Sequence, residues 1–237
     1  MNNPILNTLI NKRWLYCYLL FFCACFQRNT SQINPANETD SLTEKRMITE
    51  AMDSIHYYKG FVKQGDLILR TGRDFASETF RRLSPHDKTY SHCGIASIEH
   101  DSVFVYHSIG GEWNPDQQLR RDPFEFFCNP YENRGFGIFR YQLSPQQNKN
   151  LISEIGRLYR AKVTFDMQFD LTTDDKMYCS EFIYKAITRA SNDSVVIPVT
   201  MAGNKKFITI DDLFLNSSCR EIKRIKFIHD NKLTFAH

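Results

Sequence analysis

The sequence predicts one folded domain of mixed α and β structure that follows an N-terminal export segment. Two apolar runs, residues 91–98 and 103–109, are separated by four polar residues, a pattern typical of a β-hairpin. Residues 144–159 and the run that begins at Cys179 repeat apolar side chains at helical spacing. A chain of 237 residues with 42% hydrophobic side chains is long enough to bury a single core.

Composition and charge exclude several classes of protein. The charged fraction of 24% is that of an ordinary folded protein, which argues against an intrinsically disordered chain and against a polytopic membrane protein. The formal net charge is +3, and two of the basic residues, Lys12 and Arg13, belong to the N-terminal segment. This near balance gives no reason to expect nucleic acid as a partner.

Residues 1–25 resemble an export signal that ends in a lipidation motif. Lys12 and Arg13 precede an apolar run of about 12 residues, which suits a signal-peptide core and is too short to span a membrane. The run ends in Phe-Cys-Ala-Cys at 22–25, which resembles a bacterial lipobox whose Cys25 would be lipidated. The alternative is a plain signal peptide that is cleaved nearby. We therefore expect an exported protein of the cell envelope, anchored to the membrane as a lipoprotein.

The segment after the export signal predicts a tether followed by one continuous domain. Residues 26–45 are polar and nearly free of large apolar side chains, so we expect a flexible tether there. No repeat or interior linker interrupts residues 46–237, which predicts a single domain. Its first elements are a short helix at 46–57, a buried strand at 65–70, and a helical or irregular crossover at 71–85.

The hairpin at 91–109 carries two histidines. If its polar loop pairs Ile98 with Val103, His107 lies one diagonal away from His92 on the same face of the sheet. A shift of one residue would place the two histidines on opposite faces. The register of this hairpin therefore decides whether the two side chains can contact each other.

The second half of the chain predicts two further strands and a capped helix. The strands are expected at 137–143 and 222–228. Ser144, Pro145 and Gln147 mark the start of the helix between them, with serine at the cap, proline at the first position and glutamine at the third.

Cys179 has the position expected of a catalytic nucleophile. It starts a helical run and lies three residues before Phe182, which places it on the buried face of the helix. The positive end of a helix favours the thiolate, the reactive form of cysteine, and its free N–H groups can hold an oxyanion. A helix that begins at Asp174 or Asp175 would weaken this argument. The alternative role is a buried cysteine that packs as a small apolar residue.

The candidate acid–base residues are the two histidines of the hairpin. His92 is the candidate base, because an imidazole can take the proton of a thiol and return it to the leaving group. His107 is the candidate third residue, which orients His92 through a hydrogen bond. Glu112 and Asp116 are rivals for that role, since a carboxylate does the same orienting work. The alternative for each histidine is a structural residue of the strand.

Two tyrosines directly flank these motifs. Tyr90 and Tyr178 could each donate a hydrogen bond to a developing oxyanion in the cleft, and the alternative for each is a packing aromatic. Cys93 is expected on the opposite face of its strand from the neighbouring histidine, which makes it a poor candidate nucleophile. Glu181 is expected to face solvent and to pair with Lys185, four residues later.

The cysteines outside the N-terminal segment are Cys93, Cys128, Cys179 and Cys219. They form no CxxC pair and no tight cluster with histidine, which argues against a structural zinc site. An exported protein permits a disulfide between Cys93 and Cys128 or between Cys128 and Cys219, and the sequence does not decide between them. A catalytic Cys179 would have to stay free.

The motifs together resemble those of a known family of enzymes. Their order is that of the circularly permuted papain-like amidases of the YaeF/YiiX type, relatives of the NlpC cell-wall peptidases, and the resemblance covers about residues 60–230. The motifs that carry the resemblance are Gly65-Asp66-Leu67-Ile68, Ser91-His92-Cys93-Gly94-Ile95, Thr164-Phe165-Asp166 and Tyr178-Cys179-Ser180-Glu181-Phe182.

The resemblance implies a fold and a set of catalytic residues. The fold is α+β and permuted papain-like, with an antiparallel sheet or half-barrel packed on the helix that carries Cys179. The resemblance also implies Cys179 as nucleophile and His92 as base. The third position in such proteins is often a carboxylate, whereas a histidine such as His107 is similar to the related lecithin retinol acyltransferase group.

We therefore expect an exported cysteine hydrolase that cleaves an amide bond through an acyl-thioenzyme and requires neither a metal nor an organic cofactor. The resemblance leaves two substrate classes, peptide stems of the cell wall and acyl chains on lipids, and the envelope location favours the first. Transfer to an acceptor other than water stays open. Two alternatives come from other classes: a non-catalytic module that binds a peptide or lipid in the same cleft, and a zinc site built from His92, His107 and Cys179.

Overall fold

The computed structural model describes residues 35–111 and 114–227. The predicted export signal, the predicted lipidation site Cys25 and the rival third residue Glu112 lie outside the described residues. Residues from Thr43 onward belong to one compact unit. Within the described ranges, no helix is both long enough and apolar enough to cross a membrane.

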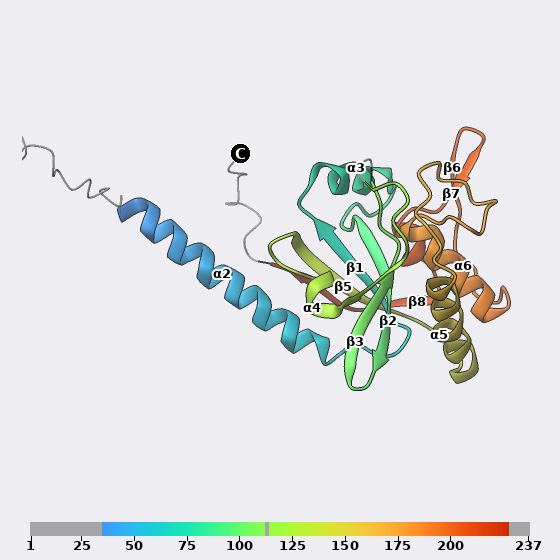
Figure 1. Cartoon of the computed structure of the whole chain (residues 1–237), viewed down its shortest axis with the longest axis horizontal. Helices are drawn as coiled ribbons and strands as arrows, with labels where there is room; N and C mark the ends of the chain where they lie inside the picture. The colour runs from blue at the N-terminus through green and yellow to red at the C-terminus, as the bar shows by residue number, and fades with distance from the viewer. Residues whose placement is uncertain (1–34, 112–113, 228–237) are drawn as a thin grey trace, which may run out of the picture. The chain divides into compact units, whose positions relative to one another are not determined.

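A six-stranded antiparallel sheet lies at the centre of this unit, in the order β4-β3-β2-β1-β5-β8 (Figure 1). Together with the helices it makes the mixed α+β architecture expected from the sequence. The strands are β1 (Leu67–Gly72), β2 (His92–Glu99), β3 (Ser102–His107), β4 (Arg120–Pro123), β5 (Asn133–Tyr141) and β8 (Cys219–Lys226).

Five α-helices, a short 3₁₀-helix and a small hairpin complete the described residues. The helices are α2 (Pro35–Lys59), α3 (Phe75–Leu83), α4 (Phe124–Phe127), α5 (Pro145–Arg160), α6 (Cys179–Ser191) and the 3₁₀-helix η1 (Asp211–Leu213). The hairpin consists of β6 (Thr200–Ala202) and β7 (Lys205–Phe207). The sequence did not predict β4, α4 or this hairpin. In β4 the residues Arg-Arg-Asp-Pro show no apolar alternation, so no local pattern marks it as a strand.

Helix α2 confirms the helix expected at 46–57 and begins eleven residues before it, at Pro35. Residues 35–45 are therefore helical, whereas a flexible tether was expected for 26–45. Proline is favoured in the first turn of a helix, and neither glycine nor proline follows it before residue 46. The polar composition of residues 35–45 is reflected in their exposure instead. Leu42 in this part of the helix is exposed, whereas Ile55 near its C-terminal end is buried.

Side chains that alternate along the strands divide the core into two clusters on opposite faces of the sheet. Helices α5 and α6 cover one face, and α4 with the C-terminal part of α2 covers the other. Residues of the first cluster include Leu67, Leu69, Cys93, Ile95 and Phe182. Residues of the second include Ala51, Ile55, Ile68, Ala96, Val105 and Phe127.

The register of the β2–β3 hairpin, which the sequence left open, is the one that pairs Ile98 with Val103. Ile98 pairs with Val103, and Glu99 pairs with Ser102. The turn therefore contains only two residues, whose φ angles of 47° and 63° are those of a tight hairpin turn. Of the two alternatives that the sequence left open, this register is the one that places the two histidines of the hairpin on one face.

The two helix starts that matter most also agree with the sequence. Ser144 Oγ accepts a hydrogen bond from Gln147 N at 3.2 Å, and Gln147 Oε1 accepts one from Ser144 N at 2.9 Å, which completes a capping box. Helix α6 begins at Cys179 itself, with Tyr178 as the capping residue. The alternative start at Asp174 or Asp175 is therefore wrong.

Candidate active site

Cys179 is buried at the first position of α6, where its thiol contacts the thiol of Cys93. The hydrogen bond from Cys93 is the largest influence on Cys179 and lowers its pKa, and the Ser180 backbone N–H at the helix start acts in the same direction against the effect of burial. Burial raises the pKa of Cys93 itself, so this second thiol stays protonated and can donate. The core cluster that holds Cys93 confirms that it faces away from His92, but its contact with Cys179 was not expected.

A chain of three side chains runs across strands β2, β3 and β4. His92 Nε2 lies 2.9 Å from His107 Nδ1, and His107 Nε2 lies 2.9 Å from Asp122 Oδ2. Each step spans 15 residues of sequence and joins diagonal neighbours on one face of the antiparallel sheet. The structure thus brings the two predicted histidines together and adds an aspartate behind them.

The hydrogen bonds of this chain determine where the imidazole protons lie. A carboxylate only accepts, so His107 donates from Nε2 to Asp122, and its Nδ1 accepts from Nε2–H of His92. The remaining nitrogen of His92, Nδ1, then carries a lone pair. Burial, followed by the Arg70 cation, lowers the pKa of His92, and burial lowers that of His107 to about 4, so both rings are neutral near pH 7.

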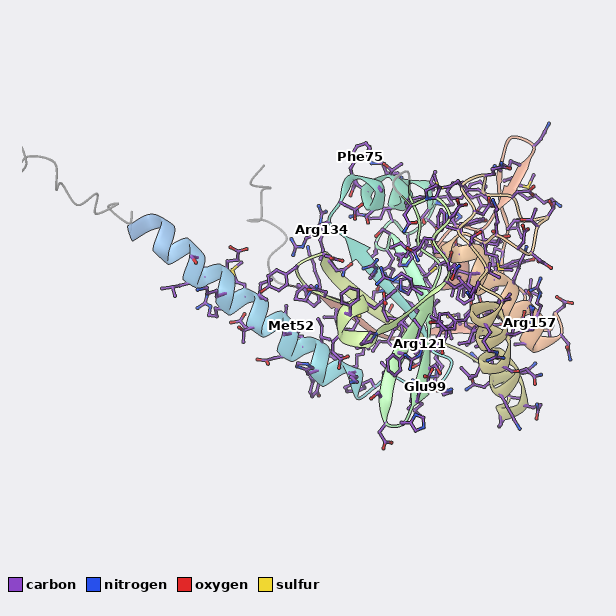
Figure 2. All side chains as sticks on the ribbon, viewed as in Figure 1. Met52, Phe75, Glu99, Arg121, Arg134 and Arg157 are labelled. Atoms are coloured by element: carbon purple, nitrogen blue, oxygen red, sulfur yellow. The ribbon has the colours of Figure 1, made fainter. Side chains whose placement is uncertain are left out.

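Asp122 stays ionised in this arrangement. Burial opposes ionisation, but hydrogen bonds from His107 and Arg120 outweigh it and lower the pKa of Asp122. On the other face of β4, Arg121 Nε donates to Glu99 Oε2 at 3.0 Å and thereby ties this edge strand to the hairpin (Figure 2). Consecutive residues of β4 thus anchor the strand and complete the histidine chain.

Cys179 and His92 line a single cavity of about 150 Å³. No hydrogen bond joins the Cys179 sulfur to the His92 ring, which is common before a substrate is bound. Most of the surrounding surface is apolar. Its larger apolar side chains include Phe80, Leu83, Phe165, Phe169, Phe207 and Ile208.

Of the two tyrosines predicted to lie in the cleft, one lines the cavity and the other does not. Tyr178 lines the cavity, and its hydroxyl oxygen accepts a hydrogen bond from Ile208 N at 2.8 Å, which leaves the hydroxyl proton available. Tyr90 does not line this cavity. Its ring packs in the core against Phe139 and Phe214, so the expectation that it lies in the cleft is wrong.

The predicted carboxylates also differ from their expected places. Asp116 is exposed and contacts neither histidine, whereas Asp122 occupies the orienting position. Glu181 pairs with Lys185 at 2.9 Å as predicted, but it is buried rather than solvent-facing, because its carboxylate also accepts from Tyr178 N at the helix start. Only the pairing of β3 with β4 would have revealed Asp122, and the sequence of β4 gives no strand signal.

All four described cysteines are free thiols, so neither suggested disulfide is formed. Cys93 and Cys128 belong to core clusters on opposite faces of the sheet, which explains why they do not pair. The described residues likewise contain no group of three or more His, Cys, Asp or Glu side chains that could hold a metal ion. The ring nitrogens that join His92, His107 and Asp122 are already used within the chain.

Comparisons with known proteins show a likeness of fold. No protein-family model matches the chain, and no curated protein is significantly similar to it. Among solved structures, the metalloprotein YiiX from Escherichia coli O157:H7, a DUF1105 protein, matches with a TM-score of 0.57 and 17% sequence identity. The match covers 69% of this chain and 98% of that one. The chain therefore has a mixed α+β fold of the YiiX type.

Proposed function

We propose that the protein is a cysteine hydrolase that cleaves an amide bond through an acyl-thioenzyme. One observation carries the proposal: Cys179, at the start of a helix, shares a cavity with His92, whose Nε2 is bound to His107, which is in turn bound to Asp122. The YiiX-type fold and the order of the motifs support a permuted papain-like amidase related to the NlpC peptidases. The sequence of the first 25 residues supports an exported, lipid-anchored protein.

The reaction begins with attack of the Cys179 sulfur on the amide carbonyl carbon. His92 Nδ1 takes the thiol proton and returns it to the nitrogen of the leaving amine, which breaks the C–N bond and leaves a thioester. A water molecule then gives a proton to His92 and attacks the thioester, and the acid product leaves as the thiol is restored. The N–H groups at the start of α6 and the Tyr178 hydroxyl are the proposed oxyanion donors.

A second candidate reaction acts on acyl lipids at the same site. The apolar lining of the cavity favours this candidate, because aromatic and aliphatic side chains gain free energy by removing an acyl chain from water. The envelope location inferred from the sequence favours cell-wall peptides instead. The catalytic steps are the same for both substrates, since each forms a thioester with Cys179.

The structural neighbour YiiX is described as a metalloprotein. The residues described for this chain do not fit a metal site, because they contain no cluster of three suitable donors. The proposed reaction accordingly uses only the thiol, the imidazoles and the carboxylate.

We predict that the described cysteines differ in their reactivity toward an alkylating reagent. Iodoacetamide near pH 6 should modify Cys179 first, because Cys179 has a lowered pKa whereas burial raises the pKa of Cys93 and Cys128 and raises that of Cys219 to about 12. Peptide mass spectrometry identifies the modified residue. The modified protein should lose hydrolysis of any substrate found in a panel of cell-wall fragments and acyl lipids.

Two variants serve as controls for this experiment. Cys179→Ala should lose activity by roughly 1,000-fold or more, as expected when a nucleophile is removed. Cys219→Ala removes a half-buried free thiol outside the cavity and should retain wild-type activity. Equal activity in Cys179→Ala and wild type would refute the mechanism, and failure to label Cys179 would favour the non-catalytic binding module.

A further inference from the structure

Arg70 is a cation in the cavity wall for which the described residues provide no carboxylate partner. It lies on β1 directly opposite His92 on β2, and both side chains line the cavity that holds Cys179. Carboxylates that influence Arg70 from a distance are those of Glu132, Asp74 and Asp122, and none of them forms an ion pair with it. The guanidinium is therefore a positive charge next to the proposed reaction centre.

The contacts that Arg70 does make hold one part of its guanidinium. Nη1 donates to Phe127 O at 3.3 Å, and the guanidinium carbon lies 4.9 Å from the centre of the Phe127 ring. The buried Nε has no hydrogen-bond partner among the described residues. A buried donor on a charged group is costly unless an acceptor satisfies it. The Arg70 side chain is thus held in place, and part of its guanidinium still lacks a hydrogen-bond acceptor among the described residues.

Asp74 is the negative charge that also lines the cavity, and its oxygens are already engaged. Oδ1 accepts from Ser77 N at 2.9 Å and Oδ2 accepts from Ser77 Oγ at 2.6 Å, which caps helix α3. Asp74 therefore stabilises the helix start rather than neutralising Arg70. A ligand would have to provide the acceptor that Arg70 lacks.

We propose that Arg70 binds a carboxylate of the substrate and thereby selects amides or esters that carry a carboxylate beside the scissile bond. The forked donors of a guanidinium match the two oxygens of a carboxylate. The apolar remainder of the cavity accommodates an apolar part of the substrate, so the substrate class is an amide or ester that combines an apolar group with a carboxylate beside the scissile bond. This inference rests on the proposed function, since it specifies the substrate of the same site.

The test compares two alkylating reagents that differ in charge. Iodoacetate carries a carboxylate and iodoacetamide does not, and both form a bond to the Cys179 sulfur with loss of iodide. The rate of each reaction is measured on the purified full-length protein by mass spectrometry. The ratio of the iodoacetate rate to the iodoacetamide rate should fall by about tenfold or more in Arg70→Gln, because a charge-assisted hydrogen bond is lost. In Arg70→Lys, which keeps the charge but loses the paired donors of the guanidinium, this rate ratio should be intermediate.

Asp74→Asn is the matched control, since asparagine also caps helices and removes a charge from the same cavity. Its rate ratio should equal or exceed that of wild type. Iodoacetamide labelling of Cys179 in Arg70→Gln shows that the variant is folded with a reactive thiol. An unchanged ratio in Arg70→Gln and Arg70→Lys would overturn the inference and leave the proposed function intact. Absence of Cys179 labelling by both reagents in wild type would overturn the proposed function and, with it, this inference.

Discussion

Asp122 determines which nitrogen of each histidine carries a proton. Its carboxylate accepts from His107, which makes His107 accept from His92 and leaves a lone pair on Nδ1 of His92, the proposed base. Arg120 Nη2 lies 2.8 Å from the same carboxylate and helps to keep it ionised. A second contact joins Cys93 to Cys179, so the proposed base and the proposed nucleophile each have a side chain behind them.

We predict that Asp122→Asn lowers kcat by up to roughly 10,000-fold, the cost seen in a catalytic triad when asparagine replaces the aspartate and the histidine takes the wrong tautomer. The asparagine amide can donate to His107 Nε2, which reverses both hydrogen bonds and places a proton on the outer nitrogen of His92. The measurement is kcat as a function of pH on the responsive substrate. Asp116→Asn removes an exposed carboxylate and should match wild type. An unchanged pH profile in Asp122→Asn would show that the chain does not orient the base.

At the scale of elements, helix α5 supports α6, the helix that carries Cys179. Leu151, Ile155 and Leu158 are buried in the cluster that also contains the apolar face of α6. Glu154 of α5 accepts from Arg189 Nη1 of α6 at 3.1 Å. The capping box at the start of α5 therefore stabilises the layer against which Cys179 is placed.

We predict that Ser144→Ala lowers the free energy of unfolding by about 1 kcal/mol, because the first turn of α5 loses its hydroxyl acceptor. Urea denaturation followed by circular dichroism measures the change. Gln146→Ala alters an exposed residue of the same turn and should change stability by less than about 0.5 kcal/mol. Equal midpoints for the two variants would mean that the cap contributes nothing measurable.

At the scale of the whole molecule, two neutral histidines are buried in the sheet. Their pKa values in the folded state are lowered, to about 4 for His107 and below the usual 6.5 for His92, with burial as the main cause. The unfolded chain therefore binds more protons than the folded chain between about pH 6.5 and pH 4. Glu181 and Asp66 act in the opposite direction, since burial raises the pKa of Glu181 to about 7 and also raises that of Asp66.

We predict that the free energy of unfolding falls as the pH decreases from about 6.5 toward 4, with His107 alone contributing a loss of about 3 kcal/mol. Urea denaturation at several pH values measures the slope. His107→Asn should flatten the slope, whereas His100→Gln changes an exposed histidine at the hairpin turn and should preserve it. A wild-type stability that is constant over this range would contradict the burial of uncharged histidines.

The sequence by itself determined the features that depend on near neighbours along the chain. The cap residues placed the start of α5, the apolar spacing placed Cys179 on the buried face of α6, and the polar loop located the hairpin that carries His92 and His107, although its register came from the structure. Those signals are strong because helix caps and hairpin turns are decided within a few residues.

Only the tertiary structure decided which distant residues complete the site. Asp122 reaches His107 through an edge strand without an apolar pattern, Arg70 stands opposite His92 through the pairing of β1 with β2, and Cys93 contacts Cys179 because α6 packs on its face of the sheet. Tyr90 lies outside the cavity for the same reason, because it packs against Phe139 of β5. Contacts between segments far apart in sequence depend on how strands pair and helices pack, and no local period encodes that arrangement.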